Sequence, residues 1–443
     1  MKQKNRLRIG CGAGFSGDRL EPAAILLQHA DLDYLVLECL AERTIALAQK
    51  RKLQDPNAGY DPLLEKRMRL LLPLLRSTGA RLITNMGAAH PVAAARKMVD
   101  MAREMGLPLK VAAVTGDDVL ALINPRDLAL ETGQALCESG ELISANAYLG
   151  ADALLPALQT DADVIVTGRV ADPSLFVAPM AHAFGWRLDD ANLIGQATVV
   201  GHLLECAGQI TGGYFADPAR KPVSGMAQLG HPFADVEPNG TATIGKVPGT
   251  GGVINLATAK EQLLYEVVNP YAYLTPDVSA DFTTVRLKQT AVNAVEASGG
   301  TGRQRPDMLK VSVGYKGGFL GEGEISYAGS YALERAQLAG EILQERLRAD
   351  FPDLRIDYVG YNAIHRMEPP SHYAQPYEVR LRIAAKAPTA ELAARIGEET
   401  EALYTNGPAG GGGARKYVTE VVGIVSTLMD RNLVHPHITL LES

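Results

Sequence analysis

The stretch Leu7–Leu37, LRIGCGAGFSGDRLEPAAILLQHADLDYLVL, contains the strand, glycine loop, helix and second strand on which the fold prediction rests. Its first apolar run is Leu7–Gly10. The helical pattern of Pro22–Ala30 begins with a proline, which suits the first position of a helix because the missing N–H would have no partner there. The continuous apolar run Tyr34–Leu37 is typical of a strand covered on both faces. The stretch therefore predicts a βαβ unit with parallel strands.

The same alternation continues along the first half of the chain. Further strands are predicted at the apolar runs Leu82–Thr84, Val111–Val114 and Val164–Thr167, with Leu142–Leu149 as another candidate. Helical patterns lie between the runs, at Pro62–Ser77, Pro91–Met105 and Ala151–Leu158. We predict an α/β domain with a parallel sheet over residues 1–217.

The second half has a different pattern, and we place the boundary near Asp217-Pro218. Asn239-Gly240 is a strong hairpin signal, and a second hairpin is expected within residues 282–298. A half-buried strand at 308–316 is followed by a long helix over Tyr331–Ala349, strands near 355–361 and 378–384, and a helix near 390–403. We predict an α+β domain over residues 218–443.

The composition indicates a soluble globular protein of two or three domains. The chain has 443 residues, of which 47% are hydrophobic and 21% are charged. A formal net charge of −7 and the lack of a basic run argue against a nucleic-acid surface. Four cysteines without a CxxC pair favour the reducing cytoplasm over a disulfide framework. We expect no signal peptide, no membrane span and a homo-oligomer.

The opening loop has the spacing G-x-G-x-x-G, formed by Gly12, Gly14 and Gly17. A strand precedes it, and Glu38 follows at the distance of a ribose-binding acid, so the outline of a dinucleotide site is present. The helix, however, begins late, at Pro22, and Asp18 places negative charge where a phosphate would lie. The loop is a dinucleotide site, a tight turn, or the lining of another active site. We favour the last, with Gly12 and Gly14 as substrate-binding residues.

Ligands of open parallel sheets bind beyond the carboxyl ends of the strands, so the polar residues there are the candidate site. Glu38 or Asp118 is the expected general base, Asn85 an oxyanion donor, and Arg169 the anchor of a substrate carboxylate. For Asp117-Asp118 the alternative is helix capping. For Arg169 the alternative is a salt bridge to Asp172 or Glu38.

Three further motifs are candidates. His202, Glu205 and Gln209 are predicted to share one helix face, either as satisfied core groups or as a functional set, and no metal site is complete. Two glycine loops can hold an anion through backbone N–H groups, and the alternative for each is a connector. The loop residues concerned are Gly249, Gly251 and Gly252 in the first loop, and Gly411, Gly412 and Arg415 in and after the second. We expect both loops to converge with Arg169 on one anionic ligand.

Ten ordered segments resemble the acyclic terpene utilisation protein family, from about Ile9 to Gly413. They are IGCGAGFSGDR, LDYLVLECLAE, ITNMG, ANAYLGAD, VIVTGRVADPSLF, GHLLECAGQITGGYF, PGTGGVI, QLLYEV, YLTPDV and NGPAGGGG. The resemblance implies a place in the degradation of acyclic terpene acids as CoA thioesters, beside other enzymes of acyl-CoA catabolism. It implies no particular reaction, and it leaves the cofactor open.

Residues and resemblance together predict a cytoplasmic catabolic enzyme that acts on a carboxylic acid or an acyl-CoA thioester. The expected chemistry is that of a hydratase, lyase or isomerase beside a carbonyl group, because the candidate site offers acids, amides and anion-binding groups. Two alternatives stay open. One is a nicotinamide-dependent oxidoreductase, and the other is a non-catalytic partner of an acyl-CoA carboxylase-type assembly.

Overall fold

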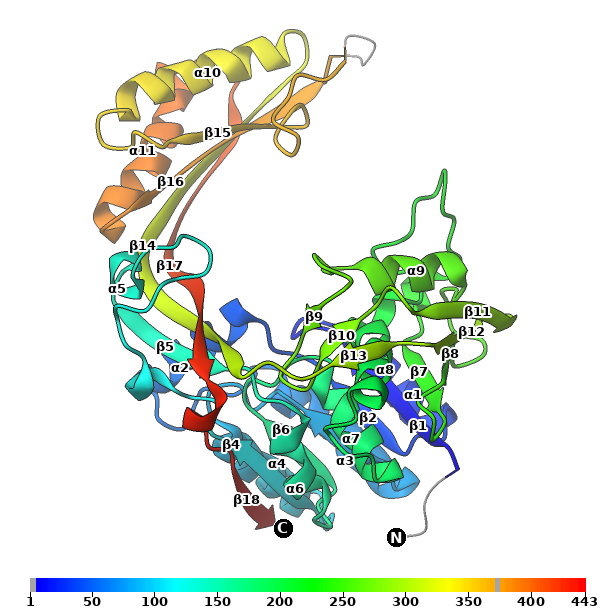
Figure 1. Cartoon of the computed structure of the whole chain (residues 1–443). Helices are drawn as coiled ribbons and strands as arrows, with labels where there is room; N and C mark the ends of the chain where they lie inside the picture. Colours follow the sequence, from blue (N-terminus) through cyan, green and yellow to red (C-terminus); the bar gives the residue numbers. More distant parts are fainter. Residues whose placement is uncertain (1–4, 371–374) are drawn as a thin grey trace. The chain divides into compact units, whose positions relative to one another are not determined.

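The computed structural model describes residues 5–370 and 375–443 (Figure 1). The chain divides into two compact units. The first consists of the described residues up to Glu138, with Leu142–Gly314 and Ile424–Ser443, and the second consists of Ser139–Glu141 and the described part of Tyr315–Gly423. The two limits of the second unit fall inside long strands, β14 (Met308–Ala328) and β17 (Gly412–Asp430). The boundary expected near Asp217-Pro218 therefore lies within the first unit.

The first unit contains five adjacent parallel strands. Their order in the sheet is β1 (Leu7–Ala13), β2 (Tyr34–Leu37), β3 (Arg81–Thr84), β6 (Val164–Thr167) and β4 (Lys110–Thr115). The helices of this region are α1 (Glu21–His29), α2 (Glu42–Gln54), α3 (Leu64–Thr78), α4 (Pro91–Glu104), α5 (Leu136–Ser139), α6 (Ala151–Leu158), α7 (Ser174–Phe184) and α8 (Ala191–Glu205). The predicted α/β character and the five parallel strands are confirmed.

The sheet continues with antiparallel strands on both sides of the parallel core. On the β1 side lie β7 (Pro232–Val236), β8 (Ala242–Lys246), β12 (Ala294–Ser298) and β11 (Arg286–Ala291), and on the β4 side lies β18 (His437–Glu442). The predicted Asn239-Gly240 turn joins β7 to β8, where Gly240 has a φ of +85°. The predicted second hairpin is β11–β12. Strands expected in a separate domain thus complete one ten-stranded mixed sheet of the first unit, because they cover the edge of β1.

Smaller elements complete the first unit. Strands β13 (Thr301–Arg303), β10 (Ser279–Asp281) and β9 (Tyr273–Leu274) form a three-stranded sheet, and α9 (Leu256–Leu264) follows the loop after β8. Strand β5 (Leu142–Ala147) pairs with β14 and does not join the parallel sheet. Short 3₁₀ turns are η1 (Leu120–Leu122), η2 (Ala207–Gln209), η3 (Met226–Gln228) and η4 (Arg431–Leu433).

The second unit has the element order β14, α10 (Ala332–Leu347), β15 (Arg355–Val359), β16 (Glu378–Ala387), α11 (Ala390–Asn406) and β17. Its strands lie in the order β15-β16-β14-β17, which is the split βαβ arrangement of a ferredoxin-like unit. Both helices contact β16 and each other (Figure 1). The long helix, the two strands and the second helix predicted in this region are all present.

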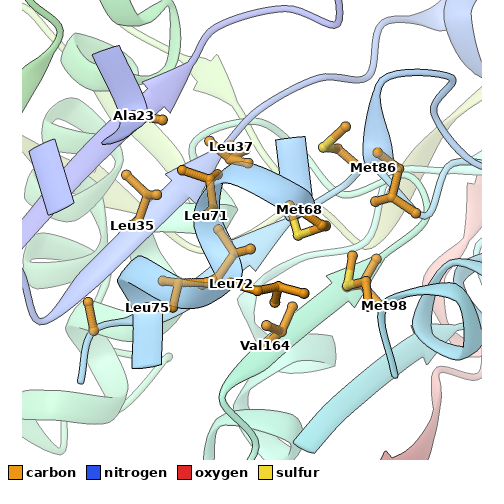
Figure 2. Packing of buried hydrophobic residues seen from close by; sticks show 14 of the residues in the cluster. Ala23, Leu35, Leu37, Met68, Leu71, Leu72, Leu75, Met86, Met98 and Val164 are labelled. Carbon is orange, nitrogen blue, oxygen red and sulfur yellow. The ribbon is translucent and has the colours of Figure 1, made fainter. Parts of the chain in front are cut away.

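A dense apolar core holds the parallel strands of the first unit. Helix α3 presents Met68, Leu71, Leu72 and Leu75 at helical spacing, and Figure 2 shows these side chains directed at Leu35 and Leu37 of β2 and at Val164 of β6. Each fully buried side chain of this size contributes about 1.5–3 kcal/mol to folding. Because neighbouring residues of a strand point to opposite faces, the equally buried Val36 shows that β2 is covered on both faces. The carboxyl ends of these strands are therefore held in place by the core, and so is the backbone of the residues that follow them.

Among residues 5–370 and 375–443, no helix is both long enough and apolar enough to cross a membrane.

Candidate active site

A cavity of about 670 Å³ lies in the first unit, at the carboxyl ends of β1, β2 and β6 and the end of α8. Leucine, methionine and proline side chains form much of its wall, among them Leu40, Leu130, Leu274, Met308 and Leu428. Charged side chains gather in the same cavity. The combination of apolar walls and a few charged groups is typical of a small-molecule site.

Glu38 comes directly after β2 and is buried in the wall of this cavity. Its Oε1 accepts the backbone N–H of Leu40 at 2.8 Å and the Nδ2 of Asn85 at 2.9 Å. Burial raises the pKa of Glu38 to about 7, although the Arg169 guanidinium and the two hydrogen bonds oppose the rise. The carboxyl is therefore held in place and titrates near neutral pH.

Asn85 follows β3, the neighbour of β2, and its side chain is fully buried beside Glu38. Its Nδ2 donates to Glu38, and its Oδ1 accepts the backbone N–H of Cys39 at 2.7 Å. Both ends of the amide are thus bound within the protein. The hydrogen bond from Asn85 therefore fixes the orientation of the Glu38 carboxyl.

Arg169 follows β6, and its side chain is only 3% exposed. Nη1 donates to the Leu40 carbonyl, Nη2 lies 3.2 Å from Oδ1 of Asp172, and the guanidinium carbon lies 4.1 Å from the centre of the Tyr148 ring. Burial would lower the pKa of Arg169, but Asp172, Tyr148 and Glu42 raise it above its ordinary value. The ion pair with Asp172, one of the two alternatives for Arg169, is present.

Three further residues of the cavity form a cluster that sequence reasoning missed. The Tyr148 hydroxyl donates to Glu42, and Nζ of Lys310 lies 3.1 Å from Glu42 Oε1 and 5.0 Å from the Tyr148 ring centre. Burial alone would raise the pKa of Glu42, but Arg169 and the Tyr148 hydroxyl lower it to about 2. These residues come from the start of α2, the segment after β5, and β14, so no motif connects them.

Asp117 holds the backbone of Arg169 in place through a hydrogen bond. Its Oδ2 accepts the backbone N–H of Arg169 and the Nδ2 of Asn146, each at 2.8 Å. Burial raises the pKa of Asp117 to about 6, and these two hydrogen bonds oppose the rise. A Cβ at Gly168 would lie 2.4 Å from Asp117 Oδ1, so only glycine allows this approach.

Asp118 lines a separate cavity of about 420 Å³, together with Gln49, Lys52 and His90. Its side chain is 46% exposed, its Oδ2 accepts from Gln49 Nε2 at 3.1 Å, and Lys52 Nζ lies 3.8 Å away. The two candidate bases, Glu38 and Asp118, are therefore not in one cavity.

The opening glycine loop places Gly14 in the cavity wall, but its N–H is already bound. It donates to Oδ2 of Asp18 at 3.0 Å, so a carboxylate of the chain occupies a position that a pyrophosphate would need. Helix α1 begins only at Glu21. A Cβ at Gly14 would lie 2.5 Å from the backbone carbonyl carbon of Cys206. Glycine is needed at this position because the two backbone segments are in close contact. Gly12 lies behind it in β1, with its carbonyl 3.2 Å from Nδ1 of His231.

The two other glycine loops belong to different units. Gly249, Gly251 and Gly252 lie in the first unit and outside the lining of the 670 Å³ cavity. The N–H of Gly251 donates to the Gln228 carbonyl at 2.8 Å, and that of Gly252 donates to the Ser224 carbonyl at 2.9 Å. These two donors therefore already have partners within the protein.

The second loop, with Gly411, Gly412 and Arg415, lies in the second unit. Gly410 and Gly413 have φ values of +76° and +66°. Glycine suits both positions because side chains disfavour this left-handed backbone conformation. Lys416 pairs with Glu401 at 2.6 Å.

His202 and Glu205 form a buried pair at the end of α8. Nδ1 of His202 lies 3.4 Å from Oε1 of Glu205, and Glu205 lines the cavity. Among the described residues, neither ring nitrogen of His202 has a hydrogen-bond partner. The prediction that Gln209 shares this helix face is wrong, because α8 ends at Glu205 and Ala207 has a φ of +44°.

Within the part of the chain that the structure describes, no group of three or more histidine, cysteine, aspartate or glutamate side chains is arranged to hold a metal ion. The functional groups of the cavity are carboxyls, one guanidinium, one ammonium, the hydroxyls of serine, threonine and tyrosine, and the Cys206 thiol. Such groups can transfer protons and hold charge.

Comparison with known proteins identifies one family. The family model described as "Acyclic terpene utilisation family protein AtuA" matches residues 7–440. Comparisons with curated proteins and with solved structures found no match. The matched range includes every residue that lines the 670 Å³ cavity.

Proposed function

Because the chain belongs to the acyclic terpene utilisation family AtuA, we propose that it is a cytoplasmic catabolic enzyme for the acyl chain of an acyclic terpene acid or its thioester. The proposed chemistry is proton transfer beside the carbonyl group, as in a hydratase, lyase or isomerase. The observation that carries the proposal is Glu38: a buried carboxyl in the cavity wall, oriented by two hydrogen bonds, with a pKa of about 7. A base that titrates near the working pH is the most effective one.

Glu38 takes the proton from the carbon next to the carbonyl in this proposal. The electron pair left on that carbon delocalises onto the carbonyl oxygen. In a dehydration, a second acid then protonates the departing hydroxyl, a double bond forms and water leaves. In an isomerisation, the second acid protonates the distant carbon instead. In either case substrate and product balance without an oxidant or reductant.

Glu205 is the second acid in this scheme. It lines the same cavity, and Nδ1 of the buried His202 lies 3.4 Å from its Oε1. The His202 ring packs against the rings of Tyr273 and Phe282, with each centre 5.3 Å away. We assign Asn85 the role of positioning Glu38 in place of the oxyanion donor expected from the sequence, since both its amide nitrogen and its amide oxygen already have a partner in the protein.

The apolar wall suits the hydrocarbon part of the substrate. Leu130, Met308 and Leu428 come from three segments far apart in the chain and line one cavity. A branched acyl chain would bury its methyl groups against them, at roughly 25 cal/mol for each Å² of apolar surface removed from water.

Deuterium exchange tests the proposal directly. The protein is incubated in D₂O with 3,7-dimethyloctanoyl-CoA, and deuterium at the carbon beside the carbonyl is followed by mass spectrometry. We expect exchange with the wild type and a loss of about 10²–10⁴-fold in Glu38→Gln, the usual contribution of a general base. Asp118→Asn tests the alternative base, and we expect it to retain exchange because Asp118 lines another cavity.

Three results would contradict the proposal. They are no exchange by the wild type, unchanged exchange in Glu38→Gln, and loss of exchange in Asp118→Asn alone. The last result would transfer the role of the base to Asp118. Melting temperatures of both variants show whether a loss of exchange reflects unfolding.

A further inference from the structure

More carboxyl groups than cationic groups line the cavity. Its cations are Arg169 and Lys310, and its carboxyls are Glu38, Glu42, Asp172, Glu205 and Glu266. An anionic ligand that enters such a cavity meets more carboxyl groups than cationic groups, in surroundings that screen charge poorly.

Both cations already have a carboxylate neighbour in the protein, although Nε of Arg169 has no hydrogen-bond partner among the described residues. Arg169 pairs with Asp172 at 3.2 Å and donates to the Leu40 carbonyl, and Lys310 pairs with Glu42 at 3.1 Å. A ligand carboxylate would compete with Asp172 or Glu42 for its cation. The displaced carboxylate would then lose its partner, although water offsets part of that cost because the Asp172 and Glu42 side chains are 31% and 37% exposed.

The carboxyls also hinder one another's ionisation. Burial raises the pKa of Asp172, Arg169 opposes the rise, and the Glu38 carboxyl adds to it. The pKa of Glu38 is raised by burial and, in smaller part, by Glu205. A further carboxylate in this position would add to the same repulsion.

One aromatic face of the cavity, the ring of Tyr148, is already in contact with both cations of the protein. The guanidinium of Arg169 lies 4.1 Å from the Tyr148 ring centre, and the Lys310 ammonium lies 5.0 Å from it. Tyr273 packs against Phe282 at 4.9 Å and against His202. These rings therefore interact with side chains of the protein itself.

We infer that the reacting end of the substrate is uncharged, a thioester or ester carbonyl, and that Arg169 is the counter-ion of the cavity's own acids, not the anchor of a substrate carboxylate. The inference rests on the proposed function in that it takes the ligand to be an acyl compound. It narrows the expected carboxylic acid or thioester to the thioester or ester class.

Three ligands that share one hydrocarbon skeleton test the inference. They are the N-acetylcysteamine thioester of 3,7-dimethyloctanoic acid, the free acid, and 3,7-dimethyloctylamine. Their dissociation constants are measured by calorimetry on the full chain at pH 8, where the free acid is ionised. We expect the thioester to bind at least tenfold more tightly than the carboxylate and the ammonium. Equal or tighter binding of either charged ligand overturns the inference, and so does the absence of thioester binding.

The variant Glu42→Gln adds an internal check. It removes one negative charge and releases Lys310, so the ratio of the carboxylate's dissociation constant to that of the thioester should fall at least threefold. A gain of the same size for both ligands would point to a change in cavity shape and would overturn the charge argument. Glu65→Gln, at an exposed carboxyl of α3, is the matched control.

Failure of the inference and failure of the proposed chemistry give different results. A thioester that binds tightly without deuterium exchange contradicts the role of Glu38 and supports the uncharged ligand. Exchange into the free acid with a lower KM than into the thioester supports the role of Glu38 and contradicts the uncharged ligand.

Discussion

Asn85 and Glu38 form a directed pair at the carboxyl ends of two neighbouring strands, with Nδ2 of Asn85 2.9 Å from Oε1 of Glu38. The same amide accepts the Cys39 N–H through its oxygen at 2.7 Å, so its orientation is determined by the backbone. The amide therefore presents a donor to Glu38 and cannot rotate without leaving a buried group unpaired.

Substitution of Asn85 should affect stability and the titration of Glu38 together. Asn85→Ala leaves the Cys39 N–H buried without an acceptor, so the free energy of unfolding should fall by about 1–3 kcal/mol in urea titrations. Loss of the donor also removes a group that lowers the pKa of Glu38, so the acidic limb of the exchange rate should move to higher pH. A stability loss with an unchanged pH profile would reduce Asn85 to a purely structural role.

Glu38 should make stability depend on pH in a defined direction. Its pKa of about 7 in the folded protein lies above its ordinary value of 4.5, so folding favours the protonated carboxyl. This contribution is fully present below about pH 4.5 and is lost as the pH rises toward 7, by up to about 3 kcal/mol in all.

The variant Glu38→Gln isolates this effect, because its amide oxygen can keep both hydrogen bonds and never ionises. We expect the variant to be more stable than the wild type at pH 8 and equal to it near pH 4, as measured by urea unfolding across this range. Parallel curves for variant and wild type would show that Glu38 does not titrate in this window. Glu65→Gln reports what a substitution at a surface carboxyl does alone.

The glycine loop should not bind NADH. The Gly14 N–H is bound by Asp18, and helix α1 begins too late to meet a pyrophosphate. Fluorescence titration of the wild type should therefore show no saturable binding at micromolar concentrations. If NADH does bind, Asp18→Asn should tighten it by removing the competing charge. Gly14→Val is a poor test, because its side chain would collide with the Cys206 backbone and unfold the loop.

Local pattern was enough to predict the parallel strands, because each is an apolar run between turn residues. It did not predict that β6 inserts between β3 and β4, or that β18 pairs with β4 from the far end of the chain. Those pairings depend on which strand edges are still unpaired in the folded sheet. A short stretch of sequence carries no information about that. The antiparallel strands β7 and β8 joined the first sheet for the same reason.

The residues of the candidate site also fall into two groups, those that could be predicted from the sequence and those that could not. Glu38, Asn85 and Arg169 could be found because each follows a predicted strand, where parallel sheets bind ligands. Glu42 and Lys310 could not, since one opens a helix with no cap signal and the other lies within a long strand. Their ion pair connects positions 268 residues apart. For Arg169, sequence reasoning named Asp172, three residues along the chain, as one possible partner, and it left the role open between an anchor and a salt bridge.

Arg169 should matter for stability because of the acids around it, and a double-mutant cycle can show this. Arg169→Met removes the guanidinium from a buried position and leaves Asp172 and Glu42 without it, so the free energy of unfolding should fall by about 3–5 kcal/mol at pH 8. In Arg169→Met/Asp172→Leu the unpaired carboxylate beside Arg169 is gone as well. The double variant should therefore recover part of the loss, with a coupling of about 0.5–3 kcal/mol between the two sites. Asp172 is 31% exposed, so water offsets part of its charge and the recovery should be incomplete. Losses that simply add would mean that the two side chains act independently, and the counter-ion role of Arg169 would then fail.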